Sequence, residues 1–215
     1  MTEAAELTPE RVRDEAHGTD GMLQVLRAGE RELEIVIWNT DGSTAEMSGN
    51  GTRIAAAWLM ARTGADNVRV LVGPRAVSVT ATSDGTYESD MGDVTVGPRE
   101  VVDGVELVTV DVGNPHAVVV GDPDDVPRLG PLLETHPRFP NRTNVQVVRV
   151  DAPGEVTARV WERGVGETTA SGSSAVAVAA ATHRDGDVLV HFPGGDLRVR
   201  LHAGRAWLTG PAEPA

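Results

Sequence analysis

The sequence predicts an α+β protein made of two pseudo-symmetric halves, each an antiparallel β-sheet or barrel wrapped around one buried central helix. Short β-rich runs separated by turn residues fill most of the 215 positions. Two further segments, 52–61 and 174–182, are apolar on nearly every face, which is typical of a buried helix. We expect the halves at residues 1–103 and 104–215, because the Gly- and Pro-containing stretch 96–104 marks a boundary. The last strand can return to the first half.

The expected strands are runs rich in Val, Ile and Leu that are bounded by Gly, Pro, Asn and Asp. They lie at residues 33–38, 68–72, 77–81, 105–112, 117–120, 145–150, 156–161, 188–192 and 197–201. The two helices lie between them, one in each half.

The composition excludes several classes of partner, cofactor and catalytic group. The 19 basic and 32 acidic residues give a net charge of −13 with no basic block, which argues against nucleic acid or an anionic membrane as a partner. No apolar run is long enough to span a membrane, and the acidic N-terminus is unlike a signal peptide, so a cytoplasmic protein is expected. The chain has no cysteine, which excludes thiol nucleophiles and disulfides. It has no lysine to hold pyridoxal phosphate, and its histidines lack the spacing of a metal site, so neither cofactor nor metal is expected.

The two halves repeat one motif. Segment 48–53, Ser-Gly-Asn-Gly-Thr-Arg, opens the first apolar helix, and segment 171–175, Ser-Gly-Ser-Ser-Ala, opens the second. Each motif alone is ordinary chemistry for a helix start. Because duplicated halves commonly face one another, the pair predicts two helix N-termini directed into one cleft, where their free N–H groups would bind a carboxylate.

Four segments, in order, resemble the diaminopimelate epimerase family. They are 39–53 and 159–172, which resemble its two active-site motifs, and 113–118 and 142–147, which resemble its asparagine-containing segments. The similarity runs from about residue 7 to 211. It implies a two-domain, homodimeric, cofactor-independent enzyme that inverts the α-carbon of diaminopimelate between its LL and meso forms, in lysine and cell-wall synthesis.

The resemblance also implies roles for single residues. Inversion without a cofactor needs one acid–base group on each face of the α-carbon, and the family's two cysteines correspond here to Ser48 and Ser171. By the same resemblance the substrate-binding residues are Gly49, Asn50, Gly172 and Ser173 for the α-carboxylate, Glu162 for the α-ammonium, and Asn39, Asn114, Asn144 and Arg163 for the far end of the substrate. His116 is assigned a structural role beside the site.

Three departures from the family leave alternatives open. The family's opening strand has no counterpart here, and Ser174 stands where glycine is usual. A serine hydroxyl is roughly five pKa units less acidic than a thiol, about 7 kcal/mol. We favour a working epimerase with activated hydroxyls. The alternatives are a binding protein that keeps the substrate pocket, and a same-fold isomerase or dehydratase whose base is a carboxylate such as Glu46 or Glu167.

Overall fold

The chain divides into two units within one of its strands, β7 (Tyr87–Asp93). A computed structural model describes residues 2–3, 7–16, 18–19, 21–45 and 47–212. Residues 1–90 with 210–215 form unit 1, and residues 91–209 form unit 2. The boundary that we expected at residues 103 and 104 falls in the turn between β8 (Thr95–Val102) and β9 (Val105–Asp111), because the Gly-Pro pair at 97–98 forms a bulge in β8 instead of a linker.

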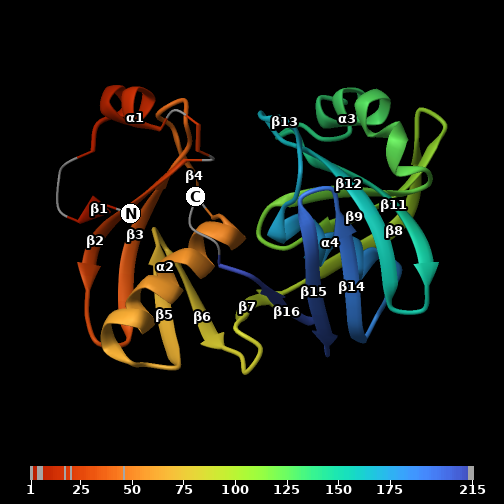
Figure 1. The fold of residues 1–215 in the computed structure, drawn as a ribbon. Coiled ribbons are helices and arrows are strands. Elements are labelled where there is room, and N and C mark those ends of the chain that lie inside the picture. Colours follow the sequence, from red (N-terminus) through yellow and green to blue (C-terminus); the bar gives the residue numbers. More distant parts are fainter. Residues whose placement is uncertain (1, 4–6, 17, 20, 46, 213–215) are drawn as a thin grey trace. The chain divides into compact units, whose positions relative to one another are not determined.

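Unit 1 is a sheet wrapped around helix α2 (Figure 1). Its elements are β1 (Thr2–Glu3), α1 (Pro9–Glu15), β2 (Met22–Ala28), β3 (Glu32–Trp38), β4 (Thr44–Ala45), α2 (Gly49–Thr63), β5 (Asn67–Val72), β6 (Arg75–Ala81) and the first part of β7. The sheet order is β1-β2-β3-β5-β6-β7. Alternate apolar side chains of β3, β5 and β6, such as Ile35 and Val70, pack on Ala55, Ala56 and Leu59 of α2. Small alanines let this helix lie close to the sheet.

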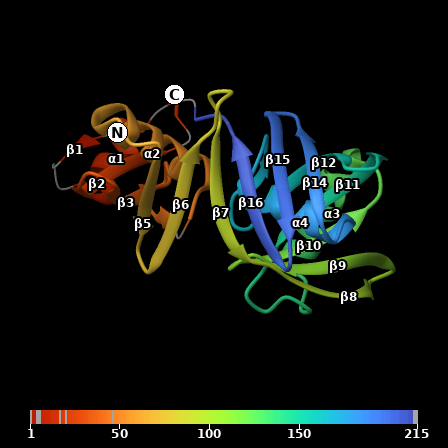
Figure 2. The ribbon, with the colours of Figure 1, turned by 90° about the horizontal axis from the view of Figure 1, so that it is seen from below.

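Unit 2 repeats the arrangement around helix α4, and its helix α3 lies between two parallel strands as α1 does in unit 1 (Figure 2). Its elements after β9 are β10 (Pro115–Val120), a short 3₁₀ turn (Pro123–Asp125), α3 (Val126–Glu134), β11 (Asn144–Ala152), β12 (Glu155–Glu162), β13 (Gly166–Thr168), α4 (Gly172–Thr182), β14 (Gly186–Phe192), β15 (Gly195–His202) and β16 (Arg205–Gly210). The sheet order is β16-β15-β14-β12-β11-β10-β9-β8. Residues Ala175–Ala179 of α4 are fully buried, as its apolar composition predicts.

The internal repeat is a repeat of topology. In unit 1, β3 pairs with the short β4, the chain enters α2, and β5 then lies parallel to β3. In unit 2, β12 pairs with the short β13, the chain enters α4, and β14 lies parallel to β12. The sheets are therefore mixed and not purely antiparallel as we expected. The reason is that each helix is a crossover connection between parallel neighbours: α1 for β1 and β2, α2 for β3 and β5, α3 for β10 and β11, and α4 for β12 and β14.

Both central helices and all nine expected strands are present at or within a few residues of their expected positions. Helix α3 was not expected from the sequence. Its two prolines and one glycine within nine residues concealed its apolar face, on which Leu129 and Leu133 are buried. None of the helices in the described part of the chain is long and apolar enough to cross a membrane.

Candidate functional site

Ser48 is the N-cap of α2. Its extended backbone (φ −139°, ψ 122°) ends the loop after β4, and its Oγ accepts a hydrogen bond from the Gly51 N–H at 3.0 Å. A Cβ atom on Gly51 would lie 3.3 Å from Ser48 Oγ and 3.1 Å from a methyl group of Leu23, so the close fit of this turn favours glycine. Gly49 is buried and Asn50 is exposed. The turn thus offers a hydroxyl and the free N–H groups of a helix start at one place.

Ser171 occupies the corresponding position before α4, with nearly the same backbone conformation (φ −148°, ψ 129°). Its hydroxyl makes no capping bond and instead donates to Glu162 Oε2 at 3.2 Å. The other carboxylate oxygen, Oε1, accepts from Thr168 Oγ1 at 2.6 Å. The hairpin of β12 and β13, in which Glu162 pairs with Gly166, brings this carboxylate back to the start of α4.

The two serines therefore differ in their hydrogen bonds. Ser171 has a carboxylate within reach of its proton, which is the arrangement that activates a weak nucleophile or base. Ser48 accepts a backbone N–H, which polarises its hydroxyl towards giving up its proton. The family resemblance implies only an ammonium-binding role for Glu162, and its hydrogen bond with Ser171 adds a second role.

A buried polar chain links Asn114 to the first turn of α4. Gln146 Nε2 donates to His116 Nδ1 at 2.9 Å and to Ser174 Oγ at 3.0 Å. His116 Nε2 then carries the ring proton and donates to Asn114 Oδ1 at 3.0 Å. Burial lowers the pKa of His116 to about 3, so the ring is neutral and this direction is kept across the physiological pH range. As a result Asn114 keeps its amide N–H groups for a ligand.

Asn144 braces two loops in this structure. Its Oδ1 accepts from the Arg163 backbone N–H at 3.0 Å, and its Nδ2 donates to the Pro115 carbonyl at 2.9 Å. The Arg163 side chain donates weakly to the Asn141 carbonyl at 3.4 Å and lies near enough to lower the pKa of His116. The contacts therefore bring Asn114, Asn144 and Arg163 into one cluster of unit 2.

Glu134, on the last turn of α3, anchors the loop that carries Arg163. The residue is 5% exposed, and its carboxylate accepts from Trp161 Nε1 at 2.7 Å, from the Gly164 N–H at 2.6 Å and from Arg142 at 2.6 Å. These three donors offset the free-energy cost of burying the carboxylate. This role was not expected from the sequence, because α3 itself was not.

Gln146 is the other residue that sequence reasoning missed. It is a fully buried amide in β11, between Val145 and Val147. A polar side chain inside such an apolar run is a signal that could have been used, since buried polar groups are uncommon and require partners.

In unit 1, Asn39 belongs to a local turn. Its Nδ2 donates to Ser43 Oγ at 2.9 Å, and Asp41 accepts from both the backbone N–H and the hydroxyl of Ser43. Among the described residues no hydrogen bond joins Asn39 to Ser48. Glu46, one of the alternative bases, lies outside the described residues.

The alternative base Glu167 is engaged elsewhere. It pairs with Arg159, which also reaches Asp124 at 2.8 Å. Two cavities, of about 510 Å³ and 300 Å³, are lined by none of the expected site residues. The described residues contain no group of three or more side chains suited to a metal ion.

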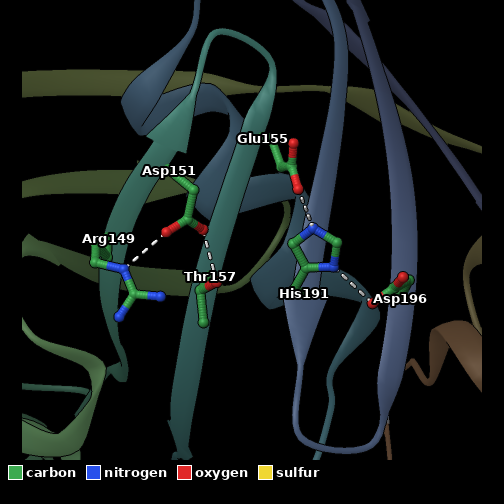
Figure 3. Close-up of polar contacts among 6 residues, drawn as sticks. All are labelled: Arg149, Asp151, Glu155, Thr157, His191 and Asp196. Atoms are coloured by element: carbon green, nitrogen blue, oxygen red, sulfur yellow. Dashed lines mark hydrogen bonds and ion pairs between the residues drawn. The ribbon is translucent and has the colours of Figure 1, made fainter.

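A second cluster of charges lies on the β11–β12 and β14–β15 hairpins (Figure 3). His191 lies between Glu155 and Asp196, with hydrogen bonds of 2.9 Å and 2.8 Å. The two carboxylates raise the pKa of His191 above its ordinary value. None of these residues contacts Ser171 or Glu162, so we treat the cluster as a stabilising feature of unit 2.

Comparison with known proteins points to one family. A family model described as diaminopimelate epimerase matches residues 4–97 and 108–213. The diaminopimelate epimerase of Desulforudis audaxviator is 40% identical over 228 residues, covering 91% of this chain and 82% of the relative. That of Desulfitobacterium hafniense is 37% identical over 226 residues, covering 91% and 80%.

Solved structures share the architecture. A Pseudomonas aeruginosa protein described as a predicted epimerase aligns with a TM-score of 0.74 at 18% identity, covering 98% of this chain and 88% of the other. A probable proline racemase from Agrobacterium radiobacter aligns with a TM-score of 0.64 at 14% identity, covering 97% and 83%. At identities this low, the alignments establish a common fold alone. That common fold confirms the α+β class expected from the sequence.

Proposed function

Because the chain belongs to the diaminopimelate epimerase family and is an isomerase, we propose that it inverts the α-carbon of diaminopimelate between the LL and meso forms by a two-base reaction without a cofactor. The observation that supports this most is the repeated start of the central helices. In each unit a two- or three-residue strand leads, three residues later, to a serine in the same extended conformation, directly before a buried helix. Each unit thus supplies one hydroxyl and one set of helix N–H groups.

The first step of the proposed reaction uses the pair Ser171 and Glu162. As Ser171 Oγ takes the α-proton, the hydroxyl proton that it already donates to Glu162, at 3.2 Å, passes to the carboxylate. Ser171 remains a neutral hydroxyl and Glu162 becomes the carboxylic acid, so no free alkoxide forms. This coupling lowers the cost of using a hydroxyl at a position where the family resemblance implies a thiol.

The second step uses Ser48. Its hydroxyl gives its proton to the opposite face of the planar carbanion and regains one from solvent, while Glu162 returns the proton that it received to solvent. The carbanion shares its charge with the α-carboxylate. We propose that this carboxylate binds the N–H groups of Gly49, Asn50, Gly172 and Ser173. There the positive ends of the α2 and α4 dipoles stabilise the growing negative charge.

The distal amino acid group of the substrate is proposed to lie at the cluster of Asn114, Asn144 and Arg163, with Asn39 from unit 1. Arg163 can pair bidentately with a carboxylate. Asn114 has amide N–H groups available because His116 occupies its oxygen. Asn144 is engaged at both ends of its amide, so its part would be to hold the Arg163 loop in place. Glu162 retains lone pairs for the α-ammonium group.

Single hydroxyl removal tests the two-base assignment. Ser171→Ala and Ser48→Ala are incubated separately with LL- and meso-diaminopimelate in deuterated water, and loss of the α-proton is followed by NMR. Each variant should lose exchange from one configuration while largely keeping it at the other. Equal loss from both configurations in both variants, with intact folds, would contradict one base per face.

We further propose that the protein is cytoplasmic and forms a homodimer. Light scattering after size-exclusion chromatography would test the dimer by its molar mass.

A further inference from the structure

Helix α2 contains a buried arginine five residues after its N-cap, Ser48. Arg53 is only 3% exposed. Its Nε donates to the Pro211 carbonyl at 2.8 Å, and its Nη1 has no hydrogen-bond partner. Burial lowers the pKa of Arg53 to about 10, which still leaves the guanidinium charged at neutral pH. Among the described residues no carboxylate pairs with it.

Such a charge is costly, because a buried ion normally needs an opposite charge or a full set of hydrogen bonds. Its position indicates what could offset the cost. Arg53 lies five residues after Ser48, and side chains on a helix lean towards its N-terminus, here towards the turn of Gly49 and Asn50. The hydroxyl of the neighbouring Thr52 is also buried without a partner. The first turns of α2 therefore hold two buried polar atoms without hydrogen-bond partners, one on a cation and one on a hydroxyl, and each can donate to an anion.

We propose that Arg53 is an electrostatic positioning residue of the unit 1 half-site, whose unopposed buried charge adds to the field of the α2 N-terminus and favours negative charge at residue 48 and at a carboxylate bound on this turn. This inference rests on the proposed function only for the statement that residue 48 exchanges protons. It gives the two halves different means of activation. In unit 2 a carboxylate receives the serine proton, and in unit 1 a cation stabilises the anion.

One other cation lies near the first turn of α2, and the remaining described charges around the helix are paired or lie at its far end. Arg75 of β6 donates to Met47 Sδ at 3.0 Å, so it is a second cation near the turn, although a less buried one. The charges on the adjoining strands pair with one another on exposed positions; these are Arg27, Glu32, Glu34 and Arg69. Arg62 lies on Trp58 near the far end of the helix. Glu46 lies outside the described residues and is therefore included in the test as a variant.

The absence of native cysteine permits a direct test. Ser48→Cys introduces the only thiol in the chain, and its pKa can be measured from the pH dependence of its alkylation by iodoacetamide, without substrate. Two unit charges roughly 10 Å apart at an effective dielectric constant of about 20 change a pKa by about one unit. We therefore expect Ser48→Cys combined with Arg53→Met to raise the thiol pKa by about one unit relative to Ser48→Cys alone.

Three controls make the result specific. Arg62→Met removes an arginine from the same helix and should leave the thiol pKa unchanged. Glu46→Gln shows how much the carboxylate of Glu46, which lies outside the described residues, contributes to the thiol pKa. Arg53→Lys keeps the charge while altering the bond to Pro211, and it should restore the low thiol pKa even if thermal stability falls. Arg53 as a simple tether of Pro211 predicts the opposite, namely equal loss of stability in the Lys and Met variants and no change in thiol pKa.

The result that overturns the proposal is a thiol pKa that differs by less than about 0.3 units between the parent and Arg53→Met. If Arg53→Met does not fold, Arg53→Gln replaces it. A parent thiol that titrates at or above the ordinary value of about 8.5 refutes the proposal without any second variant. Since alkylation needs no diaminopimelate, a protein that fails to epimerise would contradict the proposed function and leave this test intact.

Discussion

Glu162→Gln is the substitution that separates the carboxylate's chemistry from its structural contacts. Glutamine has the same shape. Thr168 and Ser171 now donate to the two carboxylate oxygens at 2.6 Å and 3.2 Å, and in the amide the oxygen can accept from one hydroxyl while the nitrogen donates to the other. Glutamine cannot receive a proton at neutral pH. The variant should therefore fold, while proton abstraction by Ser171 loses its base.

The magnitude follows from the two contacts. Removing a positioned general base costs roughly 10²- to 10⁴-fold in rate, or about 3–5 kcal/mol in activation free energy. Replacing two charge-assisted hydrogen bonds by neutral ones at the half-buried Glu162 should cost about 1–3 kcal/mol of unfolding free energy. The loss of activity should thus exceed what the loss of stability explains.

The assay is α-proton exchange of each diaminopimelate isomer in deuterated water, measured beside urea unfolding of the same preparations. Glu167→Gln is the matched control, because Glu167 lies on the same hairpin and pairs with Arg159 at the surface. We expect exchange from one configuration to fall in Glu162→Gln and to persist in Glu167→Gln. The reverse pattern would refute the reasoning and assign the base to Glu167.

Three further predictions follow from other contacts. Arg163→Ala should weaken diaminopimelate binding by roughly 2–5 kcal/mol in calorimetry with the fold intact; unchanged affinity would make it a surface residue. Gly130→Ala should cost about 1–3 kcal/mol of unfolding free energy, because its Cβ would lie 2.5 Å from the Trp161 ring; an unchanged urea midpoint would contradict this packing. His191 has a pKa raised in the folded state, so its stabilisation is complete below the unfolded pKa of about 6.5 and is lost as pH rises through the folded value. His191→Gln should make the unfolding free energy fall less as pH rises through this range. An equal fall in both proteins would refute the stabilising role of His191.

Much of the fold was accessible from the sequence because its strongest signals are local. The apolar runs at 52–61 and 174–182 specify α2 and α4 whatever surrounds them. Val- and Leu-containing strands such as β5 and β14 carry equally clear alternation. The mixed pairing could not be read in the same way, since period-two alternation does not distinguish parallel from antiparallel neighbours.

The site was accessible in part. The Ser-Gly repeat places Ser48 and Ser171 at helix starts, and both lie there. The contact of Glu162 with Ser171 depends on how tightly the β12–β13 hairpin turns, and the anchoring of the Arg163 loop by Glu134 depends on a helix that prolines concealed. Such contacts arise from tertiary structure and leave no periodic trace in the sequence.

The timing of solvent label tests the central claim of one base on each face most directly. LL-diaminopimelate is incubated with the protein in deuterated water, and deuterium at the α-carbon is measured early in the reaction, separately in residual LL substrate and in meso product. A two-base reaction takes the proton on one face and delivers deuterium on the other, so label should appear in the meso product while the remaining LL isomer still carries hydrogen. Label that enters the LL isomer as fast as it enters the product would mean that a single base serves both faces. Binding of diaminopimelate without any exchange would mean that the protein keeps the pocket but does not carry out the epimerisation.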